Sequence, residues 1–235
     1  MTSTTAVIGS TGLVGHQILT TLLALDACKT VSTISRRAPK TEASPKLSAT
    51  VDADTTKWAS HLSALSPVPA TVFSALGTTR AQAGGIANQW KIDHDLNIEL
   101  AKTARASGTE TFVFVSSAGT RGLASKLLPF AKMKVGVEDA IKSLGFKQAI
   151  ILRPGSLMGQ REVQHAGGPL IESMFRSMGK YIGQGAQDMF AQDDYVVARA
   201  AVKAANLAAQ GKAPSQYWVL EQSDIVRLGR DEWDK

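Results

Sequence analysis

The sequence lacks the residues that would tie the protein to a disulfide, a metal ion or a membrane span. Cys28 is its one cysteine, so no disulfide can form within the chain and nothing points to an oxidising compartment. The four histidines do not have the spacing of metal ligands. Even the apolar run at residues 19–25 is far shorter than the roughly 18 to 20 residues that a membrane-spanning helix needs. We therefore expect an intracellular protein without a metal site, whose membrane contact would be peripheral.

A strong charge bias and internal repeats are also missing. The net charge is +6, but lysine and arginine are dispersed and aromatic residues do not alternate with them, so we expect no nucleic-acid binding. No repeat or linker divides the 235 residues, of which 44% are hydrophobic, and this predicts one soluble domain over residues 1–235. Residues 1–5 are too few for a targeting peptide, so we expect no cleaved presequence.

Short β-rich runs alternate with longer helical patterns, which is typical of βαβ units and a parallel sheet. The runs predict strands near residues 4–8, 31–34, 47–51, 70–75, 111–116, 147–152 and 216–220. The apolar periodicity predicts helices near residues 13–25, 57–65, 88–107, 130–144, 168–179 and 194–209. The fold class is therefore α/β, a Rossmann-like doubly wound sheet with helices on both faces, and its ligand would bind where the strand order reverses.

Three glycines stand between the first predicted strand and the first predicted helix. Gly9 permits a tight turn, Gly12 lets the backbone approach a pyrophosphate, and Gly15 lets the helix pack closely on the strand. The free N–H groups of the helix would then point at the anion. We predict a dinucleotide site here, the alternative being a close-packed turn without a ligand. The predicted contact residues are Gly9, Ser10, Thr11, Gly12, Leu13, Val14 and Gly15.

The second predicted strand is followed by two arginines where an NAD site usually carries an acidic residue. Arg36 and Arg37 would grip the 2′-phosphate of NADP(H), which favours that cofactor over NAD(H), although two solvated arginines opening a loop are the alternative. Asp54 is a candidate for the adenine side or, equally, a helix N-cap. After the fourth strand, the small residues Ala75, Leu76 and Gly77 could lie beside the cofactor or form a plain turn.

Segments along most of the chain resemble the atypical short-chain dehydrogenase/reductases, and most closely two branches of them. The residues that carry the resemblance are 73–80, 83–85, 91–97, 115–119, Lys134 and 152–155. The two branches are the fungal Fmp proteins, found in the mitochondrial proteome, and the animal Tat-interacting oxidoreductase-like proteins. The resemblance implies a Rossmann-type fold, NADP(H) binding and, for the fungal branch, peripheral attachment to the mitochondrial outer membrane. Without the resemblance we would place the protein in the cytoplasm.

The resemblance also implies a catalytic site that this sequence fills only in part. The reductases use Ser, Tyr and Lys together, and Ser117, with Ser116 as second choice, and Lys134 occupy two of the three positions. The tyrosine position is Phe130, whose ring has no proton to give. Lys134 could still hold the nicotinamide ribose, beside Arg153, Pro154 and Gly155, which match the family after the sixth strand. Residues 156–192 are predicted as an insertion on the substrate side.

Two functions therefore compete. The first is an NADP(H)-dependent carbonyl or alcohol oxidoreductase with an unidentified substrate. The second is a catalytically silent dinucleotide-binding protein, a redox sensor or an assembly or tethering factor, which Phe130 favours. Asp93, His94 and Asp95 are interpreted as a solvated helix surface and not as a metal site, because successive helical residues point in different directions.

Overall fold

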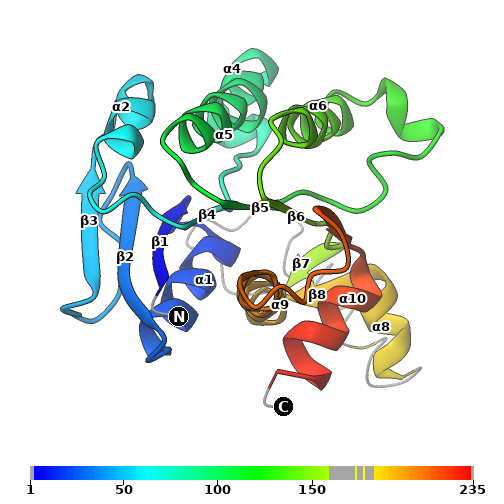
Figure 1. Ribbon diagram of the computed structural model, residues 1–235. Coiled ribbons are helices and arrows are strands. Elements are labelled where there is room, and N and C mark those ends of the chain that lie inside the picture. Colours follow the sequence, from blue (N-terminus) through cyan, green and yellow to red (C-terminus); the bar gives the residue numbers. More distant parts are fainter. Residues whose placement is uncertain (1–2, 159–172, 174–176, 178–182, 234–235) are drawn as a thin grey trace.

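The computed structural model describes residues 3–158, 173, 177 and 183–233. Its main feature is a seven-stranded sheet in the order β3-β2-β1-β4-β5-β6-β9, in which every neighbouring pair is parallel (Figure 1). The order reverses between β1 and β4, as the doubly wound prediction requires. The strands are β1 (Ser3–Ile8), β2 (Cys28–Ser35), β3 (Leu47–Val51), β4 (Thr71–Ser74), β5 (Thr111–Val115), β6 (Gln148–Leu152) and β9 (Tyr217–Leu220).

Helices cover both faces of this sheet. On one face lie α2 (Trp58–Ser63), α5 (Asn97–Ala106) and α6 (Pro129–Ser143), and on the other lie α1 (Leu13–Ala24) and α9 (Asp194–Ala209) (Figure 1). Alternate residues of β5 serve the two cores, with Phe112 and Phe114 on the α5 side and Val113 and Val115 on the α9 side. All five residues of β5 are buried, as expected for a central parallel strand.

The helix predicted near residues 88–107 has three parts, because a π-helical turn interrupts it. These parts are α4 (Ile86–Trp90), the π turn η2 (Lys91–Leu96) and α5. Asn97 stabilises the turn, since its side-chain amide donates to the carbonyls of Ile92 (3.1 Å) and Asp93 (3.2 Å). Such turns are rare and frequently lie at functional sites.

The elements that the sequence did not predict lie mostly after β6. Strands β7 (Ser156–Met158) and β8 (Ala191–Asp193) pair with each other outside the main sheet, where the predicted insertion begins and ends. The helix predicted near residues 168–179 lies outside the described residues, apart from Ser173 and Ser177. The other additions are η1 (Thr55–Lys57), α3 (Arg80–Ala83), η3 (Ala124–Leu127), α8 (Gln184–Phe190), α10 (Gln222–Val226) and η4 (Arg227–Asp231).

Among the described residues, no helix is both long enough and apolar enough to cross a bilayer.

Candidate functional site

The turn between β1 and α1 is built so that a side chain on either end glycine would collide with backbone. Gly9 has φ of +82°, and Gly12 closes the turn by donating its N–H to the Gly9 carbonyl at 3.0 Å. A Cβ on Gly9 would lie 2.8 Å from the backbone of Ala75, and one on Gly15 would lie inside van der Waals contact of the Gly9 carbonyl. Gly9 and Gly15 therefore bring the loop after β4 and the first turn of α1 close to β1.

The N-terminus of α1 lacks a side-chain cap from the described residues. Gly12 is its N-cap residue. The Ser10 hydroxyl is buried and has no hydrogen-bond partner among the described residues, a property that it shares with Thr33 on β2. A buried polar group without a partner is costly, so a ligand oxygen near Ser10 would remove a penalty. The Val14 side chain packs in the core, which leaves its backbone as the part that can face a ligand.

The residues predicted for the adenine end lie where two neighbouring strands finish. Arg36 and Arg37 directly follow β2, and both are exposed. Asp54 follows β3 and caps η1, because its carboxylate accepts the Thr56 N–H at 3.1 Å and the Thr56 hydroxyl at 2.6 Å. These hydrogen bonds lower the pKa of Asp54. The structure thus gives Asp54 the capping role that was one of its two predicted roles.

The loop after β4 is fixed by side chains from α4, η2 and α5. One carboxylate oxygen of Asp93 accepts the Thr78 N–H at 2.7 Å, and the other accepts the Gln89 amide at 3.2 Å. Gln89 also donates to the Thr78 carbonyl at 3.2 Å. Asn97 accepts the Ser74 hydroxyl at 2.7 Å. The backbone around Gly77 is therefore held at Ser74, before the loop, and at Thr78, within it.

The interpretation of Asp93 as part of a solvated helix surface is wrong. Asp93 is only 1% exposed. Asp95, by contrast, is exposed, and the Asp95 carboxylate lies 2.7 Å from the His94 ring nitrogen. Burial raises the pKa of Asp93, and the positive charge of Lys134 and the hydrogen bonds to its carboxylate oppose this rise. The error arose because the three adjacent residues were interpreted together, whereas Asp93 lies on the helix face of the buried Gln89 and Asn97, four residues before and after it.

Lys134 is a buried ammonium at the end of β5. It donates to the Val115 carbonyl at 3.1 Å and lies 4.8 Å from the centre of the Phe114 ring. Burial lowers the pKa of Lys134, while the charges of Asp93 and Glu138 raise it. A Cβ on Gly77 would lie 4.0 Å from the Lys134 nitrogen and 3.8 Å from an Asp93 oxygen. The basic group of Lys134 and the acidic group of Asp93 thus both lie beside the position that a Cβ on Gly77 would take, the space over Gly77.

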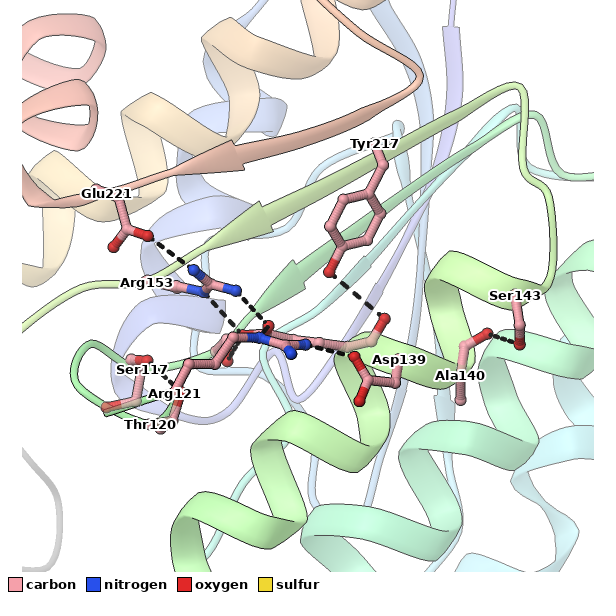
Figure 2. Close-up of polar contacts among 11 residues, drawn as sticks. Ser117, Thr120, Arg121, Asp139, Ala140, Ser143, Arg153, Tyr217 and Glu221 are labelled. Carbon is pink, nitrogen blue, oxygen red and sulfur yellow. Dashed lines mark hydrogen bonds and ion pairs between the residues drawn. The ribbon is translucent and has the colours of Figure 1, made fainter. Parts of the chain in front are cut away.

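Glu138, one turn further along α6, is the centre of a second buried charge cluster. Its carboxylate accepts the Ser116 hydroxyl at 2.6 Å, Arg121 at 2.9 Å, and Arg153 at 2.6 Å and 3.1 Å. Arg121 and Arg153 lie in two different loops, and Figure 2 shows Arg153 between Arg121 and Glu221, to whose carboxylate Arg153 donates at 2.8 Å. Burial alone would raise the pKa of Glu138, but the hydrogen bonds from Arg153, Ser116 and Arg121 hold it below its usual value.

This cluster determines where two predicted site residues point. The Ser116 hydroxyl and the Arg153 guanidinium are both turned toward Glu138, and the Glu138 hydrogen bond raises the pKa of Arg153. Ser117 is half-buried, and its carbonyl accepts the Thr120 hydroxyl at 3.2 Å. The Pro154 carbonyl accepts the Ala118 N–H at 2.8 Å, and Gly155 donates to the side chain of Gln192 at 2.7 Å.

Phe130 lies one helical turn before Lys134 on α6, and it is 42% exposed. Within the described residues there are two tyrosines, Tyr195 and Tyr217, and neither of them contacts Lys134 in place of the missing tyrosine. The Tyr217 hydroxyl hydrogen-bonds the Glu138 carbonyl at 3.5 Å, and burial raises the pKa of Tyr217 to about 12. The Tyr195 ring packs against Arg199. Tyr181 lies outside the described residues.

Sequence reasoning missed Asp93, Asn97 and Glu138 as parts of the site. Glu138 lies four residues after Lys134 and Asn97 four residues after Asp93, so each pair shares a helix face. The sequence signal available for these residues was the repetition of charged or amide side chains on the helix face that packs on the sheet. The signal was hidden for Asp93 by its polar neighbours, the partly buried His94 and the exposed Asp95.

Fold and site together define a Rossmann-type α/β protein whose glycine turn has the geometry of a dinucleotide site. The NAD dependent epimerase/dehydratase family model matches residues 5–219. The chain is 59% identical over 227 residues to protein FMP52, mitochondrial, of Chaetomium globosum, with 97% of each chain covered. It is 60% identical over 231 residues to protein fmp52-2, mitochondrial, of Aspergillus oryzae, covering 98% of this chain and 99% of that one. The chain therefore belongs to the NAD dependent epimerase/dehydratase family and, within it, to the fungal Fmp proteins.

Solved structures share the fold at low sequence identity. UDP-glucose 4-epimerase from Thermotoga maritima, solved with UDP-glucose, has a TM-score of 0.67 at 16% identity, covering 99% of this chain and 84% of that one. MoeE5, solved with UDP-glucose and NAD, has a TM-score of 0.66 at 16% identity, covering 97% and 81%. These likenesses confirm the predicted Rossmann-like fold class.

Proposed function

We propose that this protein binds a nicotinamide dinucleotide, with the pyrophosphate on the turn between β1 and α1. The observation that carries the proposal is the uncapped N-terminus of α1 above a turn in which the buried Ser10 hydroxyl has no partner among the described residues. A helix N-terminus attracts phosphate through its free N–H groups and its dipole. The family supports the assignment, as does the MoeE5 structure, which was solved in complex with NAD.

The preferred cofactor is NADP(H), with NAD(H) binding more weakly. Arg36 and Arg37 are exposed at the end of β2, where a 2′-phosphate would lie, and no carboxylate occupies residues 33–40 of the sequence to bind a 2′-hydroxyl instead. The loop of Ala75, Leu76 and Gly77 would then run beside the cofactor.

At the nicotinamide end, this chain supplies a cation and a polar strand end. Lys134 has three N–H donors, of which Val115 takes one, so the others can reach a ribose hydroxyl. Ser117 would orient a substrate oxygen, and Pro154 and Gly155 would border the space. When bound, the nicotinamide supplies hydride chemistry. Phe130 provides no proton, so an active reductase would need water or another side chain to complete the reaction.

The cofactor proposal is tested by titrating the protein with NADPH and NADH and following nicotinamide fluorescence. We expect tighter binding of NADPH, and a loss of about tenfold or more of that preference in Arg36→Ala, because a charge-assisted hydrogen bond contributes roughly 1.5–3 kcal/mol. Lys29→Ala is the matched control, since Lys29 is an exposed cation at the opposite end of β2. Equal affinity of the two nucleotides for the wild-type protein would contradict the preference.

A second candidate function is dinucleotide binding without catalysis, as a redox sensor or an assembly or tethering factor. Phe130 at the tyrosine position favours it. A silent protein should bind NADPH without turnover on a panel of aldehydes and ketones, and Phe130→Tyr should raise carbonyl reduction by roughly a hundredfold or more over the background. A wild-type rate equal to that of Phe130→Tyr would instead support the oxidoreductase.

We also propose peripheral association with the mitochondrial outer membrane. Relatives are named mitochondrial, and the loop before α6 exposes Leu123 and Leu127, at 85% and 83%, in a segment (residues 111–137) without Asp or Glu. Apolar side chains beside basic ones bind anionic lipid surfaces. Leu123→Ser with Leu127→Ser should weaken flotation with anionic vesicles, whereas Met189→Ser, also exposed, should not. Wild-type protein that stays unbound would contradict the proposal.

A further inference from the structure

Asp93 differs from the other buried carboxylate of the site in what it is bound to. Both hydrogen bonds to Asp93 come from neutral donors, the Thr78 N–H and the Gln89 amide. Glu138, by contrast, is hydrogen-bonded by two guanidinium groups, those of Arg121 and Arg153. The negative charge of Glu138 is therefore balanced within its own cluster, whereas no cationic group of the described residues is hydrogen-bonded to Asp93.

Lys134 is the cation that faces this unbalanced charge. The groups around its ammonium are the Val115 carbonyl and the Phe114 ring on β5, Glu138 on its own helix, and Asp93 from η2 across Gly77. Of the two carboxylates, Asp93 raises the pKa of Lys134 more than Glu138 does. A buried ammonium without a counter-charge tends to lose its proton, since water no longer stabilises the charge.

We infer that Asp93 is a positioning residue for Lys134. The Asp93 carboxylate keeps the lysine protonated and directed toward the space over Gly77. This inference rests on the proposed function, because that space is where Lys134 would meet the cofactor ribose. Asp93 thereby has two roles, one as a hydrogen-bond acceptor and one as a negative charge. Its oxygens hold the Thr78 loop by hydrogen bonds, and its charge sets the ionisation of Lys134.

Asp93→Asn separates these roles, because the amide oxygen can still accept the Thr78 N–H while the charge is removed. The titration of Lys134 is followed by NMR in cofactor-free protein carrying ¹³C-labelled lysine, with its signal identified by its loss in Lys134→Arg. We expect the pKa of Lys134 in Asp93→Asn to fall by about one unit or more relative to wild type. A shift of only a few tenths of a unit would overturn the inference.

Asp95→Asn is the matched control, because it removes the same charge two residues away at an exposed position. It should leave the titration of Lys134 unchanged. The reciprocal measurement covers the case in which Asp93→Asn fails to fold. In Lys134→Met, the ¹³C signal of the Asp93 carboxyl should titrate at higher pH than in wild type, since the attraction of the ammonium lowers its pKa. An unchanged Asp93 titration would also overturn the inference.

A binding arm distinguishes this inference from the proposed function. If NADPH binds, its affinity for Asp93→Asn should match wild type at pH 6 and become weaker, by up to about tenfold, as pH rises through the lowered pKa of Lys134. If the pKa of Lys134 falls in Asp93→Asn as expected but NADPH does not bind, the charge pairing stands and the proposed cofactor is rejected. Binding with the same pH dependence in both proteins would reject the positioning role alone.

Discussion

The two ends of the candidate site are made in different ways. At the β1 end, the turn from Gly9 to Gly15 is built from backbone, and the first turn of α1 has no acidic residue. At the β5 end, Lys134 and Glu138 lie buried on α6 among carboxylates and guanidinium groups. The first end depends on the absence of Cβ atoms, and the second depends on the balance of charge.

This difference determines which changes each end tolerates. A backbone-built anion site keeps its electrostatics through most side-chain substitutions, provided that the chain can still approach closely. A buried charge cluster keeps its geometry only while every charge has its partner, because an unpaired buried charge is strongly destabilising. Mutations at the two ends should therefore be distinguishable by size, pH dependence and effect on binding.

The largest effect is expected at the charged end. Glu138→Ala leaves Arg153 and Ser116 without their shared acceptor, and we expect it to lower the free energy of unfolding by about 3–5 kcal/mol. Asp139→Ala removes the exposed partner of Arg121 and should cost less than about 1 kcal/mol. Urea denaturation of both variants measures the difference. Similar midpoints for the two would show that the cluster is not a buried unit.

The pH dependence of stability sharpens this point. The pKa of Glu138 is lower in the folded protein than the ordinary value of 4.5, so its contribution is present above that pH and is lost as pH falls through the folded pKa. The stability difference between wild type and Glu138→Gln should therefore shrink below pH 4.5. A difference that grows as the solution is acidified would mean that Glu138 is protonated in the fold.

At the backbone end, Gly15→Ala should cost about 3 kcal/mol, because the added Cβ would overlap the Gly9 carbonyl and force α1 away from β1. Gly185→Ala is the matched control, since a Cβ there meets no atom of the described residues within 4 Å. Thermal and urea unfolding compare the two. A Gly15→Ala protein as stable as Gly185→Ala would contradict the close approach on which this end depends.

The smallest effect is expected at Asp54, for which the sequence allowed two roles, a contact on the adenine side or a helix N-cap. Because its carboxylate caps η1, Asp54→Ala should reduce stability slightly while leaving the NADPH dissociation constant unchanged. Thermal unfolding and the fluorescence titration measure the two quantities on one sample. Clearly weaker NADPH binding with unchanged stability would assign Asp54 to the adenine side instead.

The fold could be predicted from the sequence because its signals are local. Each of the seven predicted strands is confirmed within a few residues, and the glycine turn follows β1 as expected. Several later elements depend on contacts far along the chain. A Cβ on Gly229 would overlap the Val196 carbonyl, so η4 packs against α9 through a fit that no local pattern reveals.

The candidate site was predictable in position but not in its pairing. The predicted ends of β1, β4, β5 and β6 lie within one residue of the observed ends, and the roles of Gly77, Ser116 and Lys134 beside them stay predictions. Which side chain faces which was not readable, since Glu138 and Arg153 are 15 residues apart and meet only once α6 has packed on β6. The π turn at Lys91–Leu96 was likewise not predicted, because the apolar periodicity runs through it.

The central claim, that a dinucleotide binds on the turn between β1 and α1, is tested most directly by ¹H–¹⁵N NMR of the protein during titration with NADPH. The account predicts that the largest amide shifts occur at Gly12 and Leu13, with further shifts at Gly77. The contradicting result is no shift at millimolar NADPH, or shifts confined to the surface depression between the C-terminal ends of α1 and α9, lined by Leu25, Asn206 and Trp233.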